Sequence, residues 1–490
     1  MSATPDEPDK KKAEAESSNA DSPFKGILDK KVTRRQAVSS GIAAAAVVAG
    51  VVVAGGAGYF LGGSVGGKTV TTTETTSAVQ TGGPPKGSGT FKIGTSITTS
   101  GVTAGIVAKE SDMLAAIQTA VNARGGVYIK DRGGFVPIQI ISYPDSGFTD
   151  LSIIQSNYKK LITQDKVDIL IGATGSPQSP TAAAVAIDNS IPYIDGVAAE
   201  TSIFTLPGAG KWVVGSINVV NYWLWNYLDL LKTQTTAKTV AVVDNGDDYT
   251  TQITGTGKPA FGGLDFLKTL GFNVLTTDHV NTSFSPNFDY TAEVQKMKSL
   301  DPDVIIYADQ VGVFTAQFWQ TCKAQGYKPR AFHPIQGTTV AFTGTAGPLI
   351  QGTSAEVYWD PSRPFAGQWG RGFWDSIQTA AAFKDTDFPW LSIYYACVEI
   401  ATAGATLAGT ADKSAVADVL NSSSIATLLG EFRAQSPVRT PTAPPSGIDL
   451  GHGEGVVIPT PAQWQNGKRV IVWPPEVATG TYQYPEPFAF

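Results

Sequence analysis

The chain has 490 residues with a formal net charge of −6, and 42% of its residues are hydrophobic and 16% charged. This composition predicts a lightly charged globular protein, and the length favours two lobes or domains over one small core. The sequence has no basic block beyond the N-terminal tail, only two cysteines (Cys322 and Cys397) and three scattered histidines, which argues against nucleic-acid capture, a disulfide framework and a metal site.

The N-terminal region predicts a cytoplasmic tail followed by a membrane span. Residues 1–40 form a polar, disordered tail that ends in a basic flank containing Lys30, Lys31, Arg34 and Arg35. The stretch 41–63 has no charged residue, and a helix of that length, rising ~1.5 Å per residue, crosses the ~30 Å hydrocarbon layer. The basic flank predicts a single N-terminal span in the cell membrane, with the globular part extracytoplasmic.

Three interpretations of this apolar stretch stay open: an uncleaved signal anchor, a cleaved signal peptide and a buried core helix. Residues 33–38 resemble a twin-arginine signal. The stretch is longer than the ~7–15 residues of a usual signal h-region, which favours the anchor. The next segment, 64–90, is rich in Thr, Gly, Ser and Pro without a hydrophobic period, which predicts a flexible stalk.

From Phe91 onward, short apolar runs alternate with helical patterns. The first unit predicts strands at 91–94, 136–143, 167–172 and 191–194, and helices at 112–123, 151–164 and 181–190. The second unit predicts strands at 238–244, 272–277 and 303–308, and helices at 259–270, 290–299 and 314–325. The fold class predicted is therefore α/β, with two Rossmann-like lobes, each a parallel sheet with helices on both faces, and a ligand cleft between them.

Several segments, in this order and spacing, carry a family resemblance. They are Phe91-Lys92-Ile93-Gly94 with Ser100-Gly101, Asn122-Ala123-Arg124-Gly125-Gly126, Gly172-Ala173-Thr174-Gly175-Ser176, Ile191-Pro192-Tyr193-Ile194, Asp301-Pro302-Asp303-Val304-Ile305, and the tail 463–476. The chain resembles the extracytoplasmic substrate-binding proteins of ABC importers for branched-chain amino acids and amides, which have the type I periplasmic-binding fold. The resemblance implies discontinuous lobes, with 91–215 and 350–445 in lobe one and 216–349 and 446–490 in lobe two. It also implies a small-molecule solute and, as partners, an ABC permease and its ATPase subunits.

Candidate ligand-binding residues in lobe one follow two predicted strands. The loop Thr174-Gly175-Ser176 opens a helix, where hydroxyls and free backbone N–H groups suit a carboxylate. The resemblance implies that Ser176 holds the ligand's α-carboxylate, although Ser176 could simply cap the helix. The next strand leads into Ala198-Ala199-Glu200, where the resemblance implies contacts with an ammonium group. Glu200 could supply a negative charge or serve as a solvated acid at a helix start.

In lobe two, the resemblance implies that Tyr249 closes over the ligand. Gln310 follows the strand at 303–308, and Gln336 occupies the position of a family glutamate that pairs with the ammonium. An amide lacks that charge, so either Glu200 replaces it or the ligand has no α-ammonium, which keeps amides, aromatic acids and small carboxylates open. Trp390, in the second segment of lobe one, could cover the ligand or pack inside the lobe.

The sequence contains no Gly-x-Ser-x-Gly elbow, no His-Glu-x-x-His pair and no complete phosphate-binding loop. We therefore expect no enzymatic activity, no catalytic or metal-binding residues and no cofactor. A ligand-sensing extracellular receptor without a transport role is the alternative function, because binding folds of this kind are reused in sensors.

Overall fold

The computed structural model describes residues 84–101, 104–147, 150–196, 200–257, 262–282, 285, 287–363, 367–384, 388–434 and 459–490. All of them belong to one compact unit of the chain. The predicted tail at 1–40, the predicted span at 41–63 and the stalk up to residue 83 lie outside the described residues, so those predictions stay untested. The end of the predicted stalk is described: Lys86 forms a β-bridge with Phe135, and Gly87 N donates to the Phe135 carbonyl at 2.8 Å.

The elements of lobe one surround a five-stranded parallel sheet in the order β4-β1-β5-β6-β7. Its strands are β1 (Phe91–Thr98), β4 (Ile138–Asp145), β5 (Ile169–Ile171), β6 (Tyr193–Asp195) and β7 (Val213–Gly215). Its helices are α3 (Glu110–Ala123), α4 (Leu151–Thr163), α5 (Ser179–Asp188), α6 (Ala209–Trp212), α13 (Arg371–Ala381), α14 (Phe388–Ala408) and α15 (Lys413–Ser422). Two hairpins complete it: β2 (Val127–Ile129) with β3 (Gly134–Val136), and β13 (Ser424–Thr427) with β14 (Gly430–Arg433).

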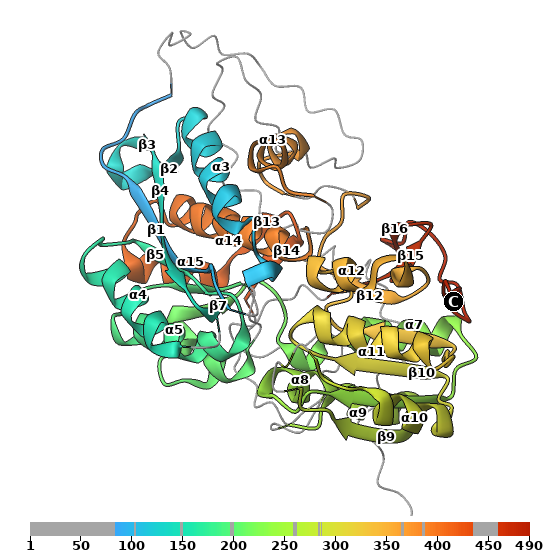
Figure 1. Cartoon of the computed structure of the whole chain (residues 1–490). Helices are drawn as coiled ribbons and strands as arrows, with labels where there is room; N and C mark the ends of the chain where they lie inside the picture. Colours follow the sequence, from blue (N-terminus) through green and yellow to red (C-terminus); the bar gives the residue numbers. More distant parts are fainter. Residues whose placement is uncertain are drawn as a thin grey trace, which may run out of the picture. The chain divides into compact units, whose positions relative to one another are not determined.

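Lobe two is built on a four-stranded parallel sheet in the order β11-β10-β8-β9 (Figure 1). Its strands are β8 (Thr239–Asp244), β9 (Asn273–His279), β10 (Val304–Ala308) and β11 (Ala331–Pro334). Its helices are α7 (Trp225–Gln234), α8 (Asp248–Thr254), α9 (Gly263–Leu270), α10 (Thr291–Leu300), α11 (Gly312–Ala324) and α12 (Val340–Ala346). The C-terminal strands β15 (Thr460–Gln465) and β16 (Lys468–Ile471) form an antiparallel sheet with β12 (Ser354–Val357). The boundaries predicted from the sequence assign β12 to lobe one and the two C-terminal strands to lobe two.

These two parallel sheets confirm the α/β class predicted from the alternating pattern. The burial that is typical of this class is clearest in β5 and β10. Every side chain of these two strands is buried, as expected of a strand covered by helices on both faces. The predicted strands and helices recur with ends shifted by a few residues. The predicted helix at 259–270 is described as α9 from Gly263, since 258–261 lie outside the described residues.

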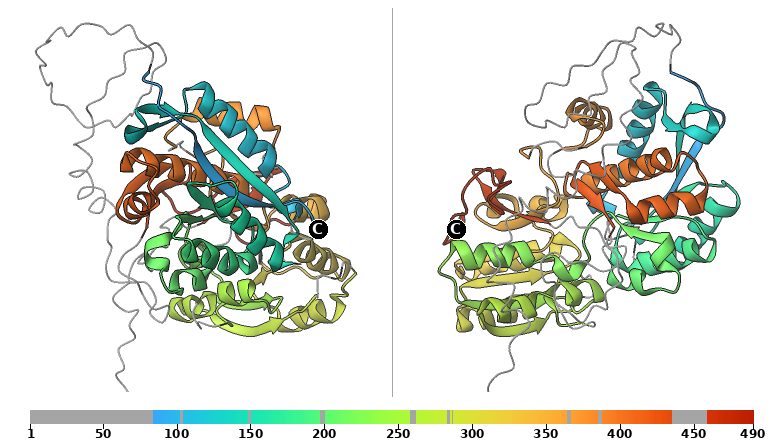
Figure 2. Two further views of the ribbon diagram at one scale, coloured as in Figure 1. Left: turned by 90° about the vertical axis from the view of Figure 1, so that its left-hand side faces the viewer. Right: turned by 180° about the vertical axis from the view of Figure 1, so that it is seen from behind.

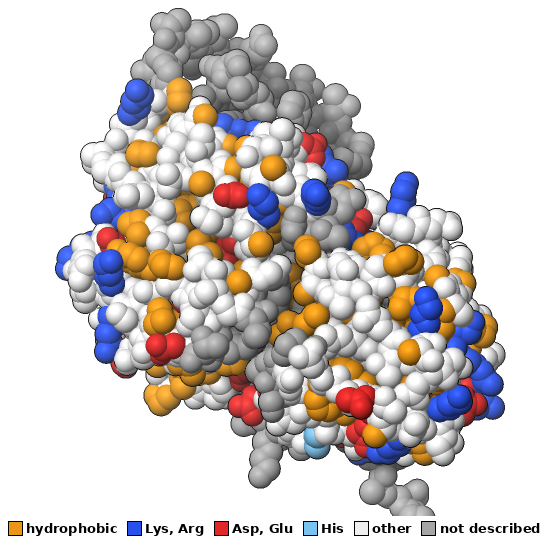
Figure 3. Space-filling model, viewed as in Figure 1, with side chains coloured by type: hydrophobic (Ala, Val, Ile, Leu, Met, Phe, Trp, Pro, Cys, Tyr) orange, Lys and Arg blue, Asp and Glu red, His pale blue; other side chains and the backbone are white. Residues whose placement is uncertain are grey.

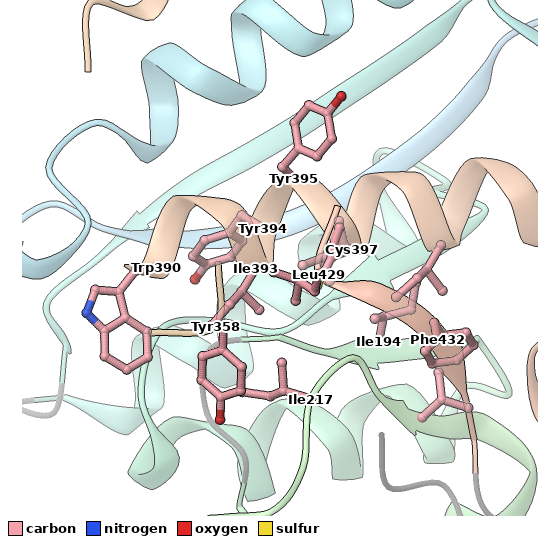
Figure 4. Packing of buried hydrophobic residues seen from close by; sticks show 14 of the residues in the cluster. Ile194, Ile217, Tyr358, Trp390, Ile393, Tyr394, Tyr395, Cys397, Leu429 and Phe432 are labelled. Atoms are coloured by element: carbon pink, nitrogen blue, oxygen red, sulfur yellow. The ribbon is translucent and has the colours of Figure 1, made fainter. Parts of the chain in front are cut away.

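The helix α14 lies in the core of lobe one. Among the described residues, its segment Trp390–Ala408 is the one helix long and apolar enough to cross a membrane by length and composition. Most of that segment is buried, and α14 lies beside β2, β5, β6 and α3, with α15 next to it in all three views (Figures 1 and 2). Side chains along α14, including Ile393 and Cys397, belong to the main hydrophobic core (Figure 4). Its apolar composition therefore reflects burial inside the lobe.

The two cysteines are both free and buried, Cys322 in α11 and Cys397 in α14. The two thiols therefore do not form a disulfide bridge. Burial raises the pKa of the Cys397 thiol to about 12 and that of Cys322 still further, so both stay protonated and unreactive at neutral pH.

Candidate functional site

The loop after β5 places Thr174, Gly175 and Ser176 at the carboxyl edge of the lobe-one sheet. Gly175 has φ +105°, a conformation that glycine adopts without strain, and Ser176 is the first residue of a short 3-10 turn that leads into α5. The side chains of Thr174 and Ser176 are almost fully buried. The Thr174 hydroxyl lies 2.5 Å from the Tyr394 hydroxyl, so this loop is packed directly against α14.

Two buried carboxyl groups that the sequence did not single out lie behind this loop. Asp145, at the end of β4, accepts hydrogen bonds from Ser96 Oγ at 2.7 Å and Thr98 Oγ1 at 2.8 Å. Glu110, the first residue of α3, is completely buried. Burial raises the pKa of Glu110 well above its usual value, and the charge of Asp145 adds to the rise, so Glu110 is held in the neutral form. Because Asp145 lies at the end of a strand, the sequence could have identified it as a candidate site residue. Nothing in the sequence indicated that Glu110 is buried.

Glu200 follows β6 and is 6% exposed. It caps the 3-10 turn η6 (Thr201–Thr205) by accepting from Ser202 N at 3.1 Å, and both of its oxygens lie 3.4 Å from Gln252 Nε2 on α8. Burial raises the pKa of Glu200, and the charge of Asp248 adds to the rise. Glu200 thus lies at a helix start, as one interpretation held, but it is buried rather than solvated, and its carboxyl group faces lobe two. Its predicted neighbours Ala198 and Ala199 lie outside the described residues.

Tyr249 and Gln336 meet within lobe two. Gln336 Nε2 donates to the Tyr249 hydroxyl at 3.1 Å, and both side chains are at least nine-tenths buried. Gln336 adopts φ +69°, in the left-handed region, two residues after the end of β11. Burial raises the pKa of Tyr249, which keeps its hydroxyl protonated. Among the described residues, Gln336 Oε1 has no hydrogen-bond partner.

Gln310 contacts the start of α8 rather than another predicted site residue. Its Nε2 donates to Asp247 Oδ2 at 2.7 Å, and Asp247 caps α8 through a 2.8 Å bond from Thr250 N. Gln310 therefore holds the start of the helix that carries Tyr249. Beside it, Asp309 is fully buried, and burial raises the pKa of this carboxyl group to about 8.

Trp390 belongs to an aromatic cluster that combines residues of both lobes. We define the aromatic cluster as Trp223, Tyr249, Tyr358 and Trp390. The Trp223 ring lies at its centre, with ring centroids 6.1 Å from Tyr249, 5.4 Å from Tyr358 and 6.0 Å from Trp390. Trp390 lies one turn before Tyr394 on α14, so the same helix contacts both the Thr174 loop and the aromatic cluster (Figure 4). The sequence did not single out Trp223 and Tyr358.

The structure therefore connects most of the predicted site residues. Thr174 contacts Tyr394 on α14, the helix that also carries Trp390. Trp223 packs against both Trp390 and Tyr249, and Glu200 contacts Gln252 on α8. All of these side chains are nearly covered, whereas two surface recesses lie elsewhere, around the turn between α7 and β8 at Thr235 and Thr236. In the described arrangement, residues assigned to the two lobes are therefore in contact.

Three carboxyl groups, those of Glu110, Glu200 and Glu356, are buried around the site, and burial raises the pKa of each of them. Within the described residues, the ion pair that involves one of these three carboxyl groups joins His333 Nε2 to Glu356 Oε1 at 3.3 Å. No group of three or more His, Cys, Asp or Glu residues could hold a metal ion in the part of the chain that the structure describes. On the outer face in Figure 3, by contrast, charged side chains of both signs are scattered among uncharged ones.

Comparison with known proteins identifies the family. The family model described as periplasmic binding protein matches residues 90–444, most of the chain. The chain belongs to the periplasmic binding protein family. This confirms the resemblance drawn from the sequence motifs.

Solved structures of periplasmic binding proteins share the fold at low sequence identity. A putative branched-chain amino acid ABC transporter protein from Silicibacter pomeroyi matches with a TM-score of 0.64 and 16% identity over 81% of this chain and 100% of its own. The branched-chain amino acid binding protein LivJ from Streptococcus pneumoniae, in complex with isoleucine, matches with a TM-score of 0.61 and 16% identity, over 78% of this chain and 98% of its own. A solute-binding protein from R. palustris, in complex with benzoate, matches with a TM-score of 0.60 and 16% identity, over 82% and 98%.

Proposed function

We propose that this protein is the extracytoplasmic solute-binding component of an ABC importer. It captures a small amino acid, amide or related carboxylate by lobe closure and delivers it to the permease, without altering it chemically. The observation that carries the proposal is the convergence of buried polar and aromatic groups from both lobes, joined by the contact between Glu200 and Gln252. Membership of the periplasmic binding protein family supports the same role.

In this mechanism, the solute first meets the lobe-one loop. The backbone N–H groups and hydroxyls of Thr174, Gly175 and Ser176, with the loop of Ala198, Ala199 and Glu200, hold its polar groups. Lobe two then closes, bringing Tyr249 and Gln336 over the solute and Trp390 against its apolar part. Gln310 contributes by fixing the start of α8. The solute drives closure to the extent that it binds the closed form more tightly than the open one.

The proposed location follows from the N-terminal sequence. A single span at 41–63 would hold the globular part outside the cell membrane, beside the permease and its ATPase subunits. Proteolysis of intact cells tests this arrangement. External protease should remove the globular part and leave a short membrane-bound fragment, and complete protection of the chain would contradict it.

Two experiments test the function. A thermal-shift screen of the purified full-length chain against amino acids, amides and small carboxylates should reveal a ligand that adds a few kcal/mol of apparent stability at saturating excess. Ser176→Ala should then weaken capture by roughly 1–3 kcal/mol in a calorimetric titration, because a buried polar partner is left unpaired. Unchanged affinity would reject the role of Ser176, and the absence of any ligand would reject the proposed function.

A further inference from the structure

Glu110 is a fully buried carboxyl group behind the proposed solute-binding loop. It is the first residue of α3, and its carboxyl group faces two hydroxyls, that of Thr174 in the loop and that of Tyr394 on α14 (Figure 4). Burial and the charge of Asp145 raise the pKa of Glu110, and hydrogen bonding to the two hydroxyls only partly opposes this rise. The carboxyl group therefore holds a proton in the folded protein.

The surroundings of Glu110 supply no counter-charge. Among the described residues, no basic side chain contributes to the pKa of Glu110. Asp145, at the end of β4, receives hydrogen bonds from Ser96 Oγ, Thr98 Oγ1 and Gly147 N. The other titratable groups that interact with the charge of Glu110 are Tyr158 on α4, and Tyr394 and Cys397 on α14. The charged groups at the start of α3 and on the neighbouring helix α13 are exposed and paired, Lys109 with Asp112 and Arg371 with Asp375.

The contact between Thr174 and Tyr394 limits where the hydroxyl protons can go. The two oxygens are 2.5 Å apart, so one hydroxyl donates to the other, and a single hydroxyl proton is left for the pair. An ionised Glu110 has only acceptor atoms and would take this proton, which would leave Thr174 only lone pairs for a solute. A protonated Glu110 has a donor of its own. It can supply the pair and free a hydroxyl proton for the solute.

We infer that Glu110 is a positioning residue whose proton sets the polarity of the Thr174 hydroxyl, so that the lobe-one loop donates to the carboxylate of the solute. The inference rests on the proposed function and deepens it, because it makes capture depend on a proton. Wherever Glu110 is ionised in the free protein, binding takes up one proton from the solvent. Affinity should therefore be highest at low pH and fall as the pH rises, by up to about tenfold per pH unit.

Calorimetric titrations of the full-length chain at pH 6, 7, 8 and 9 test the inference. The probes are 4-methylpentanoate, 3-phenylpropionate, leucine and phenylalanine, each of which carries one carboxylate. We expect at least one of them to bind, with an affinity that falls as the pH rises. Titrations in buffers of different ionisation enthalpy measure the proton uptake directly, and a merely structural role of Glu110 would not produce this uptake.

Glu110→Gln replaces the acid with an amide of nearly the same shape that donates at every pH. It should bind the probe as the unmodified protein does at pH 6 and more tightly than the unmodified protein at pH 9, without the proton uptake. Glu431→Gln, the same substitution at an exposed position on β14, is the matched control and should keep the pH dependence. Thr174→Val removes the hydroxyl through which Glu110 acts, and should weaken binding and abolish its pH dependence.

The inference is overturned if Glu110→Gln and the unmodified protein show the same pH dependence and proton uptake, or if the pH dependence persists in Thr174→Val. The thermal-shift screen separates this failure from that of the proposed function. A ligand without a carboxylate, or a carboxylate bound without proton uptake, overturns the inference and leaves the solute-binding role intact. The absence of any ligand overturns both.

Discussion

The buried carboxyl group of Asp309 should make the stability of this protein depend on pH. Asp309 follows β10, next to Gln310, and is completely buried. Its Oδ1 accepts from Val311 N at 2.8 Å, and its Oδ2 has no partner among the described residues. Burial raises the pKa of Asp309 to about 8, and the charge of Asp247 contributes to the rise.

The direction of the effect follows from proton binding. The folded pKa is above the unfolded one, so between the two values the folded state holds a proton that the unfolded state has lost. The stabilising contribution is therefore complete below the unfolded pKa and disappears as the pH rises through about 8. One such proton changes the free energy of unfolding by about 1.4 kcal/mol per pH unit, which is about 2–3 kcal/mol between pH 5.5 and 7.5.

The variant Asp309→Asn isolates this contribution. An asparagine keeps the acceptor for Val311 N and places an amide where Oδ2 lacks a partner, so the variant should fold. Urea unfolding followed by tryptophan fluorescence at pH 5.5, 6.5 and 7.5 should show that the loss of stability over this range is about 2–3 kcal/mol smaller than in the unmodified protein.

The matched control is Asp301→Asn, an exposed residue at the end of α10 with φ +46°, where asparagine is well tolerated. It should leave the pH dependence unchanged. Equal pH dependence in Asp309→Asn and the unmodified protein would refute the argument, because it would mean that Asp309 is ionised in the folded state at neutral pH.

Two further predictions concern the site and the thiols. Tyr249→Phe removes the acceptor of Gln336 Nε2 and should weaken ligand binding by about 0.5–1.5 kcal/mol, or roughly 2–12-fold, in calorimetric titrations; an unaltered dissociation constant would show that this bond does not contribute to closure. Cys322 and Cys397 should not react with a thiol reagent in the native protein and should react fully in urea, and rapid native labelling would contradict their burial.

The helices and strands of the two lobes could largely be predicted from local patterns. The run Val304–Ala308 reads as a buried strand because all five residues are apolar or aromatic, and it forms the centre of the lobe-two sheet. The helix α8 was missed because its seven residues, Asp248–Thr254, are mostly polar and show no apolar stripe. It is ordered by its caps and by packing around Tyr249.

The candidate residues Thr174, Gly175, Ser176 and Glu200 were predicted from loops that follow neighbouring strands of one parallel sheet. The predicted roles of Tyr249 and Gln336 came instead from the family resemblance. Trp223, Gln252 and Tyr358 could not be found in this way. They lie outside the strand-end loops of the predicted pattern. Trp223 and Tyr358 join the site because Trp223 packs against Tyr249, Tyr358 and Trp390, and Gln252 joins it through its contact with Glu200. Two of these contacts join residues more than 130 positions apart, and no local pattern encodes them.

The sequence by itself determined the alternation of apolar strands and helices, and with it the two parallel sheets and the family. Periodicity is a property of residues that are close in the sequence, so it can be recognised from the sequence alone. Only the tertiary structure decided which polar groups are buried. Glu110 and Asp309 look like ordinary acids in the sequence, and burial is the largest cause of their raised pKa values. Removal from water depends on what the rest of the chain packs around a residue, and for that reason the electrostatic character of the site emerged only from the fold.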